Sequence, residues 1–150
     1  MKKIPIFIAL ALVALTFVGA TKASAKEKGG KEAILWAPED LKWMPLSPGA
    51  PGVMSVNLWG DNTKGAYGGL TKFPAGFKAP LHTHKYATKI VVIKGGYTYN
   101  GKTYGPGSYV YVPAGHQHES GGVADSESIF FIEQDGKFDM KPVEPPKEKK

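Results

Sequence analysis

The four histidines of this 150-residue chain fall into two closely spaced pairs. His82 pairs with His84 and His116 with His118, with one residue between the two members of each pair. Alternate residues of a β-strand point to the same face, so a His-x-His pair presents two imidazoles side by side. Because neighbouring strands lie about 5 Å apart, an imidazole from an adjacent strand can complete a metal site. One such pair is more often a surface or hydrogen-bonded core pair, but two pairs that use every histidine point to a metal centre.

The composition restricts what else the chain can do. It contains no Cys, which excludes disulfides, zinc ribbons and thiolate catalysis and leaves His and carboxylates as metal ligands. All 19 basic residues are Lys, and the absence of Arg counts against base-reading contacts and phosphate clamps. We therefore expect no nucleic-acid partner.

Residues 1–25 have the pattern of a signal peptide. Lys2 and Lys3 precede an apolar run over 4–20, and Ala23-Ser24-Ala25 supplies the small-x-small pattern just before the expected cleavage point. A membrane anchor is the alternative, but a run of about 17 residues is at the short limit for crossing a bilayer. Cleavage removes three lysines and reduces the net charge from +6 to +3, which favours neither nucleic acid nor a membrane surface. We expect a bacterial periplasmic or secreted protein without membrane contact after cleavage.

The rest of the chain is organised as one domain with loose ends. We expect a flexible leader over 26–35, a domain over 36–140 and a disordered tail rich in Lys and Pro over 141–150. The domain holds short β-prone runs separated by Gly and Pro, the pattern of a sandwich or small barrel. The expected strands are 53–59, 66–73, 81–84, 88–94, 96–100, 102–104, 109–112 and 128–133, with a short helical turn at 38–41.

The clearest local signal is Asn100-Gly101, which lies between two aromatic, β-prone triplets. Both central residues of a type I′ turn need positive φ, and Asn-Gly meets that requirement. The sequence therefore predicts a tight hairpin at this point.

Glycine and histidine spacing adds a family resemblance. Two segments resemble the two motifs of the cupin superfamily. In the first, Gly76 is followed after five residues by the first His pair; in the second, Gly107 is followed by Pro113, Gly115 and His118. The upstream stretch resembles the ChrR-type cupins through Trp43, Pro48-Gly49, Leu58-Trp59-Gly60-Asp61 and Phe73-Pro74-Ala75-Gly76. That group includes a domain attached to anti-sigma factors and small exported proteins of unknown role.

The resemblance implies an all-β, single-domain cupin, that is, a double-stranded β-helix or jelly-roll barrel. It also implies that His82, His84 and His118 are metal ligands. The divalent transition metal is left open among Fe, Zn, Ni, Cu and Mn, because imidazole suits several of them.

The chain departs from the cupin pattern where a Glu ligand is expected. By strand parity Thr88 continues the face of His84 and takes the place of this Glu, and no acid occurs between residues 62 and 118. Three neutral imidazoles leave a divalent ion its full charge, so we expect an open position for a small anionic or bidentate oxygen ligand. A role for His116 as a fourth ligand stays open, but we favour a place at the rim or as a hydrogen-bond donor to a ligand, and we place Tyr86 at the border of the pocket.

Three interpretations of function stay open. The first is an exported metal- and ligand-binding or sensing module, and the second is a three-histidine dioxygenase acting on a small acid, enol or diketone. The third is a cupin that binds no metal, because three ligands hold an ion less firmly than four. The chain offers few candidates for a general base, which favours binding over catalysis. Open barrel edges also make a homodimer an expectation.

Overall fold

The structure is a computed structural model that describes residues 33–144. The predicted signal peptide, most of the predicted leader and the end of the predicted tail lie outside the described residues. The described elements, in chain order, are the 3₁₀ helix η1 (Pro38–Asp40) and the strands β1 (Met44–Pro45), β2 (Met54–Gly60), β3 (Tyr67–Phe73), β4 (Lys78–Thr83), β5 (Thr88–Lys94), β6 (Tyr97–Tyr99), β7 (Lys102–Tyr104), β8 (Tyr109–Val112), β9 (His118–Gly122), β10 (Ser128–Gln134) and β11 (Lys141–Pro142).

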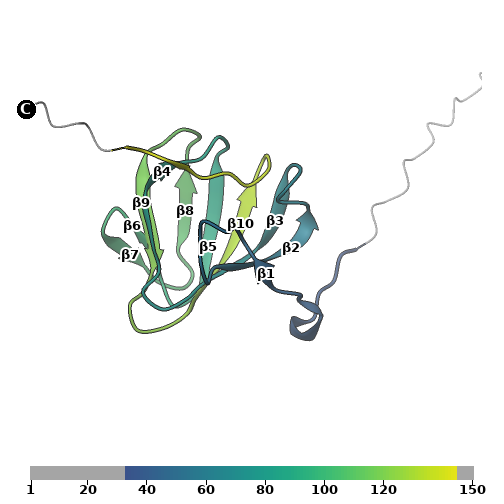
Figure 1. The fold of residues 1–150 in the computed structure, drawn as a ribbon. Coiled ribbons are helices and arrows are strands. Elements are labelled where there is room, and N and C mark those ends of the chain that lie inside the picture. The colour runs from purple at the N-terminus through teal and green to yellow at the C-terminus, as the bar shows by residue number, and fades with distance from the viewer. Residues whose placement is uncertain (1–32, 145–150) are drawn as a thin grey trace, which may run out of the picture. The chain divides into compact units, whose positions relative to one another are not determined.

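The strands form two antiparallel sheets (Figure 1). One has the order β1-β2-β3-β10-β5-β8 and the other the order β11-β4-β9-β6-β7. Strands far apart in the chain therefore become neighbours, as β10 does with β3 and β5. The all-β jelly-roll prediction is confirmed. Within residues 33–144 no helix has the length and apolar character needed to cross a membrane.

The inner faces of the sheets bury an aromatic centre. Phe130 of β10 is fully buried and meets Phe73 and Tyr97 edge-on, with ring centroids 5.0 and 5.2 Å apart. In β5 the alternate residues Ile90 and Val92 are buried beside it. The inward set of β5 begins with Thr88, so the same alternation that builds the core also places this residue in the interior.

The predicted hairpin is confirmed. Asn100 and Gly101 have φ values of 46° and 79°, as a type I′ turn requires, and Tyr99 pairs with Lys102 across it. All eight predicted strands and the helical turn are present, with shifted boundaries at several strand ends.

Three strands, β1, β9 and β11, were not predicted from the sequence. β9 reads HESGG, which lacks β-branched and aromatic residues, yet it lies between β4 and β6 in the sheet. Its Gly121 is required by close packing, since a Cβ there would lie 2.5 Å from the carbonyl oxygen of Phe77. The two-residue strand β1 was missed as well.

The predicted tail begins too early. Lys141 and Pro142 form β11, which pairs with Thr83 and His82 of β4, and Val143 donates its N–H to the carbonyl of Leu81. A Pro is tolerated in this strand because β11 lies at the edge of its sheet.

Candidate metal centre

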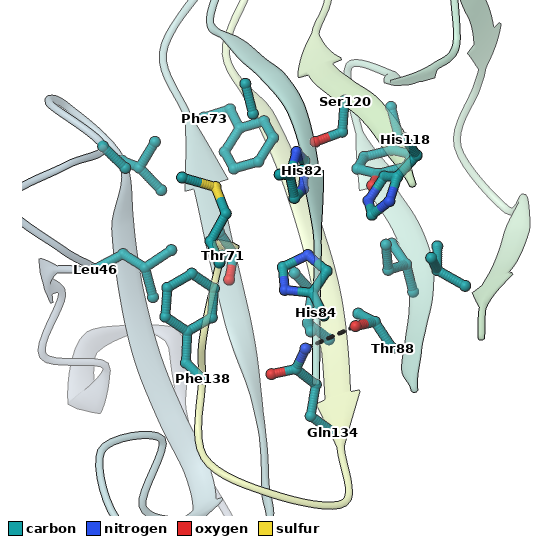
Figure 2. Close-up of a pocket in the computed structure, with 18 of the residues that line it drawn as sticks. Leu46, Thr71, Phe73, His82, His84, Thr88, His118, Ser120, Gln134 and Phe138 are labelled. Atoms are coloured by element: carbon teal, nitrogen blue, oxygen red, sulfur yellow. Dashed lines mark hydrogen bonds between the residues drawn. The ribbon is translucent and has the colours of Figure 1, made fainter. Parts of the chain in front are cut away.

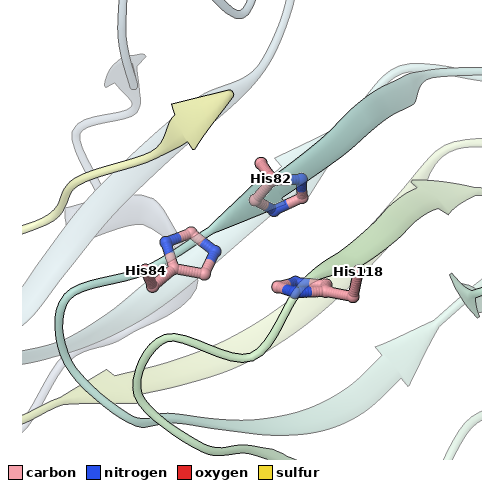
Figure 3. Close-up of side chains that lie close together, drawn as sticks. All are labelled: His82, His84 and His118. Carbon is pink, nitrogen blue, oxygen red and sulfur yellow. The ribbon is translucent and has the colours of Figure 1, made fainter. Parts of the chain in front are cut away.

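Two neighbouring strands bring three of the four histidines together. His82 and His118 are direct register partners on β4 and β9, and His84 follows β4 by one residue. Their ligand-capable nitrogens lie within 4.8 Å of one another, and the rings converge (Figure 3). The three residues are between 1% and 9% exposed. Imidazoles gathered at this spacing suit a single divalent ion.

Backbone carbonyls orient all three rings. The Nδ1 of His82 lies 2.6 Å from the carbonyl oxygen of Pro80, that of His118 lies 3.1 Å from the carbonyl oxygen of His116, and that of His84 contacts the carbonyl oxygen of Asp139. A carbonyl only accepts, so each Nδ1 carries the proton and donates. Each Nε2 therefore keeps a free lone pair, which is the form of histidine that binds a metal.

Burial favours the neutral form of two of the three imidazoles. It lowers the pKa of His84 below the ordinary value of 6.5, and it lowers the pKa of His118 to about 4. Neutral rings at pH 7 are ready to bind a cation without first releasing a proton.

These pKa shifts predict that the metal-free protein loses stability in acid. In the unfolded chain histidine titrates near 6.5, whereas folded His118 titrates near 4, so the unfolded state takes up protons first as the pH falls. The stabilisation is complete above 6.5 and is lost as the pH falls toward 4. Urea midpoints of metal-free protein measured between about pH 7.5 and pH 4.5 test this. The variant His118→Gln should show a shallower pH dependence, and an identical slope in both proteins would contradict the expectation.

Three uncharged side chains, linked by hydrogen bonds, lie at the position where the cupin pattern has a Glu ligand. Thr88 is buried on the same inner face, as its parity predicts. Its Oγ1 accepts from the Nε2 of Gln134 at 2.6 Å (Figure 2). The Oε1 of Gln134 in turn accepts from the hydroxyl of Tyr67 at 3.1 Å. Burial, reinforced by the charge of Asp139, raises the pKa of Tyr67, which therefore stays a neutral donor.

Gln134 and Tyr67 were missed by sequence reasoning. Gln134 of β10 is the register partner of Thr88 in β5 on one side and of Tyr67 in β3 on the other. Strand parity alone could not find them, because the strand order that places β10 between β3 and β5 is a property of the fold.

The histidines occupy one end of a cavity of about 60 Å³ between the two sheets. Figure 2 shows the imidazoles grouped near Thr88 and Ser120, with apolar side chains on the other side. The described lining residues include no Asp, Glu or Lys. The apolar part of the wall comprises Leu46, Ala50, Val53, Phe73, Phe77, Ala79, Ile90, Val112, Ile132, Phe138 and Met140.

His116 and Tyr86 lie apart from this cluster. His116 is exposed, and its ring is stacked at 6.3 Å from Tyr99, so only its backbone carbonyl supports the site, through His118. Tyr86 is outside the cavity lining and packs on Gly136, where a Cβ would lie 2.3 Å from its ring.

Comparison with known proteins decides the family. The model of the ChrR cupin-like domain family matches residues 31–137. The chain belongs to this family. In this ChrR cupin-like domain the three-histidine cluster fits a divalent metal site, because three free Nε2 atoms meet with no cationic side chain in the described cavity wall. The resemblance inferred from the histidine and glycine spacing is therefore confirmed.

Solved structures share the fold. An RmlC-like cupin protein from Ralstonia eutropha JMP134 is 25% identical, with a TM-score of 0.60 over 71% of this chain and 69% of that chain. A chain from the structure of Rhodobacter sphaeroides SigE in complex with the anti-sigma ChrR is 22% identical, with a TM-score of 0.55 over 66% of this chain and 52% of that chain. A proposed acetylacetone dioxygenase from Methylibium petroleiphilum PM1 is 20% identical, with a TM-score of 0.58 over 77% and 85%. A search of curated proteins finds no match to this sequence.

Proposed function

We propose that this ChrR cupin-like domain binds one divalent transition metal through His82, His84 and His118 and uses it to hold a small ligand. The observation that carries the proposal is the convergence of three buried imidazoles, each with Nδ1 held by a backbone carbonyl and Nε2 free. A bound metal supplies Lewis acidity and open coordination positions. The chain's own residues orient the three rings and shield them from bulk water.

The cavity defines the class of ligand. Part of the wall offers three imidazoles and the hydroxyls of Thr88 and Ser120, and most of the remaining wall residues are apolar. No lysine lines the described cavity, so a negative ligand finds its counter-charge at the metal alone. We therefore propose a ligand with an anionic or bidentate oxygen head and a small apolar body.

This ligand class predicts a chain-length dependence. With the Co²⁺-loaded protein, the affinities of acetate, propionate, butyrate and valerate should rise by about fourfold per methylene until the cavity is full, since each buried methylene contributes about 0.8 kcal/mol. Titration followed by the visible spectrum of Co²⁺ measures this series. Equal affinities along the series would contradict an apolar binding wall.

A binding or sensing role is the proposal that the site supports best, because the described cavity wall holds no carboxylate or lysine that could move a proton. Oxygenation of a small diketone is the second candidate, favoured by the open coordination that a three-histidine set leaves. Oxygen uptake by the Fe²⁺-loaded protein with acetylacetone separates the two. Tight metal binding without uptake supports the binding module.

We also propose that the chain is exported and self-associates. The first proposal rests on the sequence pattern of residues 1–25. The second rests on an apolar row that crosses five strands in direct register on the outer face of the larger sheet: Val56, Leu70, Phe131, Val91 and Tyr109. Val91 and Tyr109 are 37% and 62% exposed, whereas an outward sheet face is usually polar. Mass spectrometry of the periplasmic fraction should find a chain that begins at Lys26, and an intact N-terminus would contradict export. Light scattering should give the mass of a dimer, and a monomer would contradict self-association.

A further inference from the structure

A strap formed by residues 135–143 runs from the end of β10 to the edge of β4 (Figure 1). Its last part is β11, which pairs with Thr83 and His82. Phe138 and Met140 of the strap belong to the cavity wall, and the Phe138 ring lies 6.1 Å from that of His84. The strap is therefore both part of the wall and a direct neighbour of two candidate ligands.

Asp139 holds two consecutive residues after β4. Its backbone carbonyl accepts from the Nδ1 of His84, and its carboxylate accepts from the backbone N–H of Lys85 at 2.9 and 3.1 Å. The carboxylate thus fixes the place of the carbonyl that orients the imidazole. Among the three orienting carbonyls, those of Pro80 and His116 lie two residues from the histidine they hold, whereas that of Asp139 is 55 residues away in the chain.

Other contacts hold the strap at its two sides. The N–H of Phe138 donates to the carbonyl of Asn62 at 2.7 Å, and that of Val143 donates to the carbonyl of Leu81 at 3.0 Å. These two amides report whether the strap is docked, because both lose their acceptors when it lifts.

We propose that Asp139 is a positioning residue for His84 and that docking of the strap and binding of metal stabilise each other. This inference rests on the proposed metal site. With the strap docked, the Asp139 carbonyl keeps the proton on Nδ1 and the lone pair on Nε2; a metal on Nε2 keeps Nδ1 as the donor that the strap needs. The coupling is reciprocal by thermodynamic linkage.

Hydrogen exchange and zinc affinity test the two halves of this coupling. In the parent chain, saturating Zn²⁺ should slow exchange at the amides of Phe138 and Val143 by about tenfold or more. The variant Asp139→Ala should speed their exchange in the metal-free protein and weaken Zn²⁺ binding by about tenfold, the usual range when an orienting partner of a ligand is lost. A chelating dye in competition gives the affinity.

Two further variants separate position from charge. Asp139→Asn keeps an acceptor for the Lys85 N–H but loses the charge, and it should recover most of the affinity. Glu144→Ala removes an exposed acid one residue beyond the strap and should behave as the parent. If the parent binds Zn²⁺ but Asp139→Ala matches it in affinity and exchange, the coupling alone is overturned. Asp139→Asn as weak as Asp139→Ala, with parental exchange, would show an effect of charge and also overturn it. A parent chain that binds no Zn²⁺ overturns the proposed function together with the coupling.

Discussion

We expect His82→Ala and His118→Ala to abolish metal retention, whereas the parent chain, purified without added metal, should carry close to one divalent ion per chain. Each substitution removes one of three nitrogen ligands and leaves two imidazoles, which weakens binding at least about a hundredfold. The two residues lie opposite each other on β4 and β9. His82→Ala therefore leaves one ligand, His84, just after β4, and His118→Ala leaves β9 with none. Elemental analysis of the three purified proteins measures the effect.

The matched control is His116→Ala. This residue is also a histidine, lies two positions from His118 and is exposed, and its contribution to the site is a backbone carbonyl that alanine retains. It should keep its metal. Circular dichroism of each variant shows whether the sheets are intact, since His82 and His118 are fully buried. Metal loss in His116→Ala, or full occupancy in a folded His118→Ala, would refute the assigned ligand set.

Thr88→Glu should increase metal retention and weaken the binding of anions. Thr88 lies on the inner face beside the histidines, so a carboxylate at this position adds a fourth, negative ligand to a neutral set. The charge at the bound ion falls from +2 to +1, which strengthens the hold on the cation and reduces its pull on an external anion. We expect metal release to slow by about tenfold or more and azide affinity to fall by a similar factor.

Thr88→Gln separates charge from size in this experiment. It has the length of Glu without its charge, and it disturbs the hydrogen bond from Gln134 in the same way. Release rates follow from transfer of Co²⁺ to a chelator, and azide binding from the Co²⁺ spectrum. If Glu and Gln variants release metal at the same rate, residue 88 does not reach the ion.

The part of the site that could be predicted is the part set by local geometry. The alternation of a single strand places His82, His84 and Thr88 toward the interior, and the structure shows all three there. The same rule fails at His116, because Gly115 adopts a φ of 74° in the preceding turn and the chain is not yet a strand. Parity therefore extends only as far as the strand itself.

The part that could not be predicted depends on pairing between distant segments. Gln134 reaches Thr88 because β10 lies beside β5, and Asp139 reaches His84 because β11 pairs with β4. Gln134 and Asp139 both lie far from these residues in the sequence, so local patterns around the histidines give no sign of them. The Lys- and Pro-rich end of the chain has the composition of a disordered tail, yet two of its residues gain order from the free edge of β4 rather than from their own propensities.

The acceptors that orient the three imidazoles are main-chain oxygens, and this has a consequence for the divergence of such proteins. A side-chain replacement at Pro80, His116 or Asp139 leaves the carbonyl oxygen itself in the chain. Related proteins that keep the backbone path therefore keep the acceptors that orient the three imidazoles. The apolar residues opposite are free to change with each new chemical niche. A designer could accordingly exchange an apolar wall residue outside the strap, such as Leu46 or Phe77, to admit a different ligand while the three histidines stay in place.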